Sequence, residues 1–269
     1  MKAHDTQRMS DRKARIDERL GGGQEWRLRP MTEGANVRYE VADRVTATTA
    51  GGIALIHEMV RYLGLPEAID RCLHIFKRHF PYFESDHVLN LAYNILAGGT
   101  CLEDIERLRC DEAYLTALGA ERVPDPTTAG DFLRRFTTDL LLDLAQAINE
   151  VRPEVWRHLP PSQRQLARID ADGTLTKTTG ECKEGMEVSY KGTWGYAPLI
   201  VTLANTGEIL FTLNRPGNAP SHLGAAWYLD QAADQVLDGG FLRVLFRGDT
   251  DFALTTNFDR WTDEDKWFV

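Results

Sequence analysis

Two aspartates separated by one residue, Asp170 and Asp172, lie in the segment LARIDADGTLT, whose apolar and polar residues alternate as in a β-strand. Side chains two apart on a strand point to the same face, so this face must be wet or metal-bound to hold two carboxylates. A further acid, Asp249, ends the apolar run FLRVLFRG, and Asp251 comes two residues later. Carboxylates gathered at strand ends from distant parts of a chain are typical ligands of Mg²⁺.

Such an acid cluster supports phosphodiester chemistry. Two metal ions about 3.5 to 4 Å apart, held by shared carboxylates, activate a water or a 3′-hydroxyl on one side of a phosphate and stabilise the leaving oxygen on the other. An Asp-x-Asp pair is weak support by itself, because loops and helix caps also use aspartate freely. The surrounding elements must therefore position the acids.

The acids fall in a region, residues 161–269, whose period is extended rather than helical. Three strands are expected, in LARIDADGTLT, YAPLIVTLAN and EILFTLNRP. Thr206 and Gly207 between the last two form a tight-turn signal, which predicts an antiparallel hairpin. A helix follows over HLGAAWYLDQAADQVL, with Ser221 as its expected cap and Gly239 at its end.

A short buried strand, FLRVLFRG, comes after that helix and leads to Asp249. The order strand, strand, strand, helix, strand is that of an RNase H-like fold with a mixed β-sheet. The last residues, KWFV, have the pattern of a further strand that begins where the chain stops. We therefore expect the sheet domain to be incomplete at the C-terminus, as in a truncated or fragmentary product.

The region before the sheet reads as helical over residues 46–160, where apolar residues recur three and four apart, and glycines at 64, 98 and 119 mark helix ends. One long amphipathic helix is expected after VPDPTT, with Thr128 and Asp131 as a capping pair. Its buried stripe would comprise Phe132, Leu133, Phe136, Leu140, Leu144 and Ile148. Residues 1–45, rich in charge and glycine, are expected to form a mobile arm.

The runs IDADGT, KGTWGYAPLIVTLANTGEILFTLNRPGN, SHLGAA and FRGDTDFA together resemble bacterial insertion-sequence transposases of the DDE type, group 1 of the transposase DDE domain. The resemblance extends from about residue 50 to the end and is most specific over residues 169–253. Its implied first acid matches Asp172, in an Asp-x-Thr context, with Asp170 as the other acid often present there. The second acid matches Asp249 in a Gly-Asp-Ser-like turn, and the third, a Glu on a later helix, would lie beyond Val269.

The resemblance implies a DNA transposase that cleaves strands and transfers 3′-hydroxyls at insertion-sequence ends. It would use two Mg²⁺ ions, with Mn²⁺ as a substitute, held by Asp172, Asp249 and Asp170. The helical part would bind or position DNA, and the family implies a homodimer across paired transposon ends. The bacterial cytoplasm, at the nucleoid, is the expected location. Without its third acid, this chain alone is expected to be inactive.

Several further residues are candidates for DNA contact. Arg134 and Arg135 lie off the apolar stripe, although a solvated helix face explains them equally well. Arg215 and His222 could hold a phosphate at the edge of the site, Arg215 by a bidentate contact, and a structural turn at NRPGN is an equal alternative. The aromatic residues at 194 and 196 could stack on a splayed base, but aromatic residues beside a strand more often belong to the core.

Composition bounds these interpretations. With 269 residues, of which 43% are hydrophobic, the chain can bury a sizeable core. Its net charge of −9 is unusual for a nucleic-acid binder, although clustered catalytic acids contribute to that charge. Four cysteines without a C-x-x-C pair argue against a disulfide framework and a zinc ribbon. The longest apolar stretches are too short for a membrane span, and the N-terminus has no secretory signal pattern.

Two alternatives stay open. Asp170 and Asp172 in DADGT also spell the nucleophile and general-acid motif of haloacid-dehalogenase-type phosphatases, and GDTD at 248–251 is similar to the metal motif of that family. Polar residues in the first strand and the hairpin that follows it argue against this assignment, because a central parallel strand is usually apolar. The second alternative is a transposase product that binds DNA or dimerises without catalysis.

Overall fold

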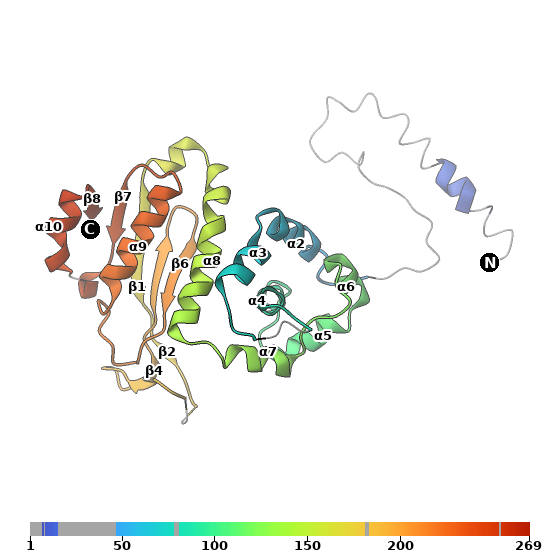
Figure 1. The fold of residues 1–269 in the computed structure, drawn as a ribbon, viewed down its shortest axis with the longest axis horizontal. Coiled ribbons are helices and arrows are strands. Elements are labelled where there is room, and N and C mark those ends of the chain that lie inside the picture. Colours follow the sequence, from blue (N-terminus) through green and yellow to red (C-terminus); the bar gives the residue numbers. More distant parts are fainter. Residues whose placement is uncertain (1–6, 8, 16–46, 78–80, 181–182, 253) are drawn as a thin grey trace. The chain divides into compact units, whose positions relative to one another are not determined.

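The computed structural model of the protein describes residue 7 and residues 9–15, 47–77, 81–180, 183–252 and 254–269. The chain divides into two compact units, Met1–Thr48 and Thr49–Val269. In the first unit residues 9–15 are helical, and most of the arm expected over residues 1–45 lies outside the described residues. The second unit combines helices with a mixed sheet, as the sequence predicts (Figure 1).

The first part of the second unit is helical. Its elements are α2 Ile53–Tyr62, α3 Leu65–Cys72, α4 Glu84–Leu96, η3 Leu102–Asp104, α5 Ile105–Arg109, α6 Glu112–Leu118, α7 Pro126–Leu133 and α8 Thr138–Arg157. Gly64, Gly98 and Gly119 follow the ends of α2, α4 and α6 with φ of 70°, 85° and 63°. This backbone conformation is strained for other residues, so the glycines end the helices as predicted.

The prediction of one long helix after VPDPTT is wrong, because the chain forms two. The side chain of Asp125 accepts a hydrogen bond from the backbone N–H of Thr128 at 2.9 Å and caps α7. Thr137 accepts from the N–H of Leu140 and caps α8. Thr128 thus donates to the cap instead of acting as one. The break also leaves Leu133 exposed, whereas the other predicted stripe residues are buried or half-buried.

The main sheet follows a short helix, η4 Pro161–Arg164, and has the strand order β6-β5-β1-β7-β8. The strands are β1 Ala167–Gly173, β5 Leu199–Leu203, β6 Glu208–Leu213, β7 Val244–Arg247 and β8 Lys266–Phe268. Neighbours β6, β5 and β1 are antiparallel, while β1, β7 and β8 are parallel. The β5–β6 hairpin is confirmed, although its turn spans the four residues 204–207 rather than two.

Residues 174–198 contain a second sheet that the sequence analysis did not predict. Its strands, β2 Thr176–Lys177, β3 Glu187–Val188 and β4 Trp194–Tyr196, pair in the order β2-β4-β3. Gly195 in the central strand is required by packing, because a Cβ there would lie 2.1 Å from the carbonyl oxygen of Thr176. Strands of two or three residues leave no hydrophobic period to recognise.

Helices cover one face of the main sheet. α9 Ala225–Asp238 packs on β1, β5, β6 and β7 and also contacts α8, and Trp156 of α8 lies in the same core as Ile169 and Val201. The expected cap of α9 is wrong: the helix begins after Gly224, with φ of 77°, and no side chain caps it. Ser221 instead lies in the turn before the helix.

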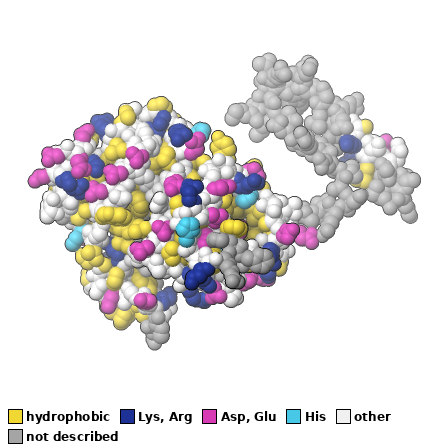
Figure 2. Space-filling view, in the orientation of Figure 1, with side chains coloured by type: hydrophobic (Ala, Val, Ile, Leu, Met, Phe, Trp, Pro, Cys, Tyr) yellow, Lys and Arg dark blue, Asp and Glu magenta, His cyan; other side chains and the backbone are white. Residues whose placement is uncertain are grey.

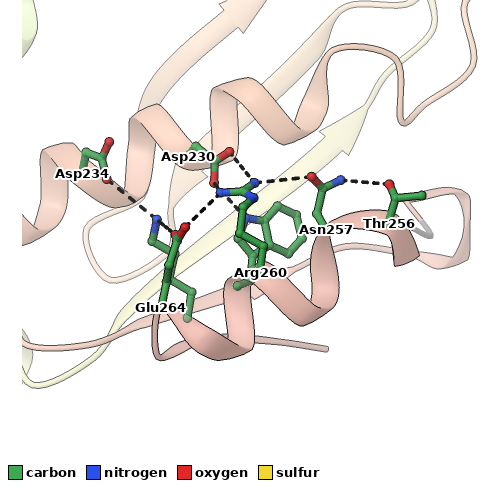
Figure 3. A network of polar contacts seen from close by, with 8 residues as sticks. Asp230, Asp234, Thr256, Asn257, Arg260 and Glu264 are labelled. Atoms are coloured by element: carbon green, nitrogen blue, oxygen red, sulfur yellow. Dashed lines mark hydrogen bonds and ion pairs between the residues drawn. The ribbon is translucent and has the colours of Figure 1, made fainter.

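The crossover from β7 to β8 runs through η5 Thr250–Phe252 and α10 Thr255–Asp263, and a polar network joins it to α9 (Figure 3). Asp230 accepts from Arg260 and from the indole N–H of Trp261, each at 2.7 Å. The ammonium of Lys266, at the start of β8, lies 2.7 Å from Glu264 and 3.8 Å from Asp234 of α9. These contacts tie the parallel edge of the sheet to its helical layer.

Candidate active site

Asp170 and Asp172 lie on the face of β1 opposite the helices. Ala167, Ile169 and Ala171 alternate with them and are buried beneath α9. The alternation of the segment therefore separates a core face from an acidic face, as predicted from its period of two. The side chain of Asp172 makes no hydrogen bond or ion pair with the described residues, so its carboxylate is available to a ligand.

The side chain of Asp170 forms an ion pair with Arg247, which the sequence analysis did not predict. Arg247, the last residue of β7, donates from Nε to Oδ1 at 2.6 Å and from Nη2 to Oδ2 at 2.7 Å. The hydrogen bonds to Asp170 raise the pKa of Arg247. The two residues are register partners in the parallel β1–β7 pair, which explains the bidentate geometry.

Asp249 begins the turn after β7. Its Oδ1 accepts from the backbone N–H of Asp251 at 2.9 Å, and its carbonyl accepts from Phe252 at 3.0 Å. The preceding residue, Gly248, has no room for a side chain, because a Cβ there would lie 2.9 Å from the Cβ of Phe252. The local turn fixes the backbone of Asp249 and leaves its second carboxylate oxygen free of hydrogen bonds to described residues.

The parallel register aligns the two strand ends. Asp170 pairs with Arg247, the last residue of β7, and Asp172 and Asp249 each follow this pair by two residues. Adjacent strands lie about 4.8 Å apart. Two carboxylates that are 77 residues apart in the sequence are therefore brought to the same end of the sheet.

A cleft of about 920 Å³ opens beside these strand ends. One side consists of Gly173 and Thr174 at the end of β1 and of Asp249 and Asp251 after β7. The second sheet contributes Val188 to Lys191, and the turn before α9 contributes residues 217–222. Asp249 thus borders a space large enough for several nucleotides or another extended ligand, and Asp172 immediately precedes Gly173 in its lining.

Comparison with known proteins identifies the family of the chain. A sequence model of the family described as transposase DDE domain group 1 matches residues 32–268. The chain belongs to this family. No curated protein and no solved structure matches it. Membership in a transposase family implies DNA as a partner and nucleic-acid processing as the general activity.

Of the other candidate residues of this transposase-family chain, Arg215 and His222 line the cleft, whereas Arg134 and Arg135 do not. Arg215 is buried: Nε donates to the carbonyl of Ala197 at 2.8 Å, and Nη1 donates to Pro220, Ser221 and Leu223. Burial lowers its pKa. These contacts belong to the structural turn that was one of its two expected roles. Its Nη2 has no hydrogen-bond partner among the described residues.

His222 is exposed and borders the cleft, so it lies near the acids. Arg134 and Arg135 follow α7 in the helical part and do not border the cleft. Arg134 lies 2.6 Å from Asp131, and the guanidinium of Arg135 lies 5.4 Å from the centre of the Phe76 ring. Basic and acidic side chains are interspersed over the face shown in Figure 2.

Two other kinds of feature, a preformed metal cluster and a membrane-spanning helix, are absent from the described residues. Within the described ranges no three His, Cys, Asp or Glu side chains converge to hold a metal ion. Asp172 and Asp249 nevertheless offer free carboxylate oxygens, which suit Mg²⁺ because it is usually bound by one or two carboxylates together with water and substrate phosphates. No helix in the described part is long and apolar enough to cross a membrane.

Proposed function

We propose that the chain carries the catalytic acids of a DNA transposase that cleaves strands at insertion-sequence ends and joins the freed 3′-hydroxyl to target DNA. The observation that supports this proposal is the parallel β1–β7 register: Asp172 and Asp249 each follow the Asp170–Arg247 pair by two residues, and Asp249 lines the cleft. Both acids also occupy the positions that the family resemblance assigns to its first two acids.

The sheet supports an RNase H-like assignment for residues 161–269. Three antiparallel strands are followed by a helix, a parallel strand, a second helix and another parallel strand, in the spatial order third, second, first, fourth, fifth. This order puts the first and fourth strands side by side, so the acid-bearing ends become neighbours. The helical part, residues 46–160, is the proposed DNA-positioning domain.

Asp172 and Asp249 would hold Mg²⁺, with Mn²⁺ as a substitute. When bound, the metal would activate the attacking hydroxyl and offset charge on the leaving oxygen. Asp170 is the supporting acid: both of its oxygens accept from Arg247, so it joins the ligands only when that ion pair opens. A second ion requires ligands beyond Asp172 and Asp249.

The chain's own residues would orient the DNA. The exposed side chain of His222 lines the same cleft as Asp249, where it can contact a phosphate. Arg134 and Arg135 remain proposed phosphate contacts for DNA outside the cleft. A homodimer across paired transposon ends, in the bacterial cytoplasm at the nucleoid, is the proposed working state.

The phosphatase alternative is disfavoured by the neighbours of β1. One neighbour, β5, is antiparallel, and the chain leaves β1 through a second sheet rather than a crossover helix. A nucleophile strand of the phosphatase type would lie within a parallel sheet. The second alternative, a transposase product without catalysis, predicts the same fold and DNA binding but no DNA cleavage.

Metal binding and DNA cleavage together test the proposal. Mn²⁺ titration followed by electron paramagnetic resonance should show binding that Asp172→Asn and Asp249→Asn each weaken at least about 10-fold. Asp263→Asn, an exposed substitution on α10 away from the cleft, serves as the matched control. In a form of the enzyme that carries the third catalytic acid, cleavage of a labelled duplex with the element's terminal repeats should fall at least about 100-fold in the same two variants.

Unchanged Mn²⁺ affinity in both variants would refute the shared metal site. DNA binding with no metal-dependent cleavage would support the non-catalytic alternative. Hydrolysis of p-nitrophenyl phosphate that Asp170→Asn abolishes would instead favour the phosphatase, because that chemistry makes Asp170 the nucleophile.

A further inference from the structure

An exposed tyrosine stands on a rigid turn at the cleft. Tyr190 is 88% exposed, although a large aromatic side chain is usually at least half-buried. It follows β3 in the five-residue turn that leads to β4. The chain therefore presents an aromatic side chain to solvent in the cleft that Asp249 lines.

Three hydrogen bonds fix the conformation of this turn. The N–H of Ser189 donates to the carbonyl of Thr193 at 2.9 Å, and the N–H of Thr193 donates back to the Ser189 hydroxyl at 3.1 Å. Gly192, with φ of 72°, closes the turn through a hydrogen bond to the Ser189 carbonyl at 2.8 Å. Ser189 is buried beneath it. A turn fixed in this way presents Tyr190 without a large ordering cost on binding.

The surroundings of Tyr190 suit a nucleotide. The ammonium of Lys191 lies 5.2 Å from the centre of the Tyr190 ring, which places a cation beside an aromatic face. Both residues border the cleft whose other side contains Asp249 and His222. A base can stack on the ring while its phosphate contacts the lysine, a combination that single-stranded nucleic-acid sites use repeatedly.

The aromatic residues nominated from the sequence do not fill this role. The hydroxyl of Tyr196 donates to the carbonyl of Glu184 at 2.7 Å, and its backbone bridges to Pro216, so Tyr196 holds the second sheet together. Trp194 is half-exposed on β4 but does not border the cleft. Tyr190 is the aromatic residue that the structure places there.

We infer that Tyr190 is a stacking platform for one unpaired base of the DNA strand that enters the cleft, with Lys191 contacting the adjacent phosphate. This inference rests on the proposed function, because it takes DNA as the occupant of the cleft. Stacking supplies affinity with little sequence preference, since every base has an aromatic face. Tyr190 thereby positions a strand end beside Asp172 and Asp249 without taking part in the chemistry.

The test uses the full chain and a single-stranded oligonucleotide of about 12 nucleotides containing a fluorescent adenine analogue that stacking quenches. Low salt and the absence of divalent metal keep the measurement independent of catalysis. We expect wild-type protein and Tyr190→Phe to bind and to quench the probe. Tyr190→Ala should bind about 5- to 150-fold more weakly and lose the quenching. Tyr62→Ala removes a 77% exposed tyrosine on α2, outside the cleft, as the matched control.

Equal binding and quenching by wild type and Tyr190→Ala would overturn the inference, as would binding by wild type without quenching. Asp249→Asn separates the two proposals, because it should weaken Mn²⁺ binding while the probe still stacks. Mn²⁺ binding that depends on Asp172 and Asp249, combined with no effect of Tyr190→Ala on the probe, would refute the stacking platform alone. Lack of any DNA binding by the full chain would refute both.

Discussion

Arg247 holds both carboxylate oxygens of Asp170 across the parallel pair of β1 and β7, at 2.6 and 2.7 Å. The ion pair joins the two strands that carry the candidate acids and lies two residues before each of them. It also decides how much negative charge the acidic face presents, because Arg247 offsets one of the two carboxylates of β1.

This ion pair should contribute modestly to stability. The side chains of Arg247 and Asp170 are 42% and 35% exposed, so solvent screens their attraction. A double-mutant cycle with Arg247→Gln and Asp170→Asn, measured by urea unfolding, should give a coupling free energy of about 0.5 to 1 kcal/mol. Arg168→Gln is the matched control, since Arg168 lies on the same face of β1. A coupling near zero would show that the bidentate pair does not stabilise the sheet.

Metal affinity should change in the opposite direction to stability. Arg247→Gln removes a cation beside the proposed site and frees the carboxylate of Asp170, so Mn²⁺ should bind several-fold more tightly. In the Asp170→Asn background the same substitution should have a smaller effect, because no carboxylate is released. Weaker Mn²⁺ binding by Arg247→Gln would mean that Arg247 positions the acids instead of competing for one of them.

Arg215 should prove structural. It is buried, and its guanidinium donates to four carbonyls from two segments, which a lysine ammonium cannot span. Arg215→Lys should lower the free energy of unfolding by about 2 to 4 kcal/mol, because carbonyls lose a charged donor in a buried turn. Arg168→Lys, at an exposed position, should stay within about 0.5 kcal/mol of wild type. A stable Arg215→Lys protein that binds DNA poorly would instead assign the residue to phosphate contact.

Gly239 should not tolerate a side chain. A Cβ at this position would lie 2.3 Å from Cε3 of Trp156, which is fully buried where α8 meets α9. Gly239→Ala should therefore destabilise the protein by about 1 to 3 kcal/mol through overpacking. Gly51→Ala meets no atom within 4 Å and should be neutral. Equal melting temperatures for the two variants would show that Trp156 relaxes at little cost.

The sequence contains enough information to place the acids but not to define their surroundings. Alternation along β1 predicts the face of Asp170 and Asp172, because a period of two follows directly from strand geometry. The partner of Asp170 depends on a register between segments 77 residues apart, which a local pattern does not encode. Counting back two residues from Asp172 and Asp249 would have suggested Arg247.

Helix caps also show how far a local sequence pattern can predict the structure. Thr137, a good capping residue three positions before Leu140, was a local signal for the break between α7 and α8. The start of α9 is different: Arg215 binds the carbonyls of Pro220, Ser221 and Leu223 and thereby holds the preceding turn. Ser221 has the right chemistry for a cap, but this contact from outside the helix determines where α9 begins.

A buried histidine should make stability depend on pH. His87 on α4 is almost fully buried, and its ring stacks on Phe132 with centroids 4.5 Å apart. Burial lowers its pKa, which the nearby carboxylates of Asp86 and Glu84 only partly oppose, while Arg135 lowers it further. The folded protein therefore keeps His87 neutral at pH values where the unfolded chain, with a pKa of about 6.5, already binds a proton.

The sign of the effect follows from proton linkage. Above about pH 6.5 His87 is neutral in both states and contributes no pH dependence. Below that value the unfolded state binds more protons, so the free energy of unfolding falls by at most about 1.4 kcal/mol per pH unit until the folded pKa is reached. Urea unfolding at about pH 7.5 and about pH 5.5 should show this loss, and His87→Phe should reduce it. His57, whose pKa burial also lowers, should account for part of the remainder. His158→Gln, at an exposed position, should leave the loss unchanged, and a His87→Phe protein with the full wild-type loss would exclude His87 as its source.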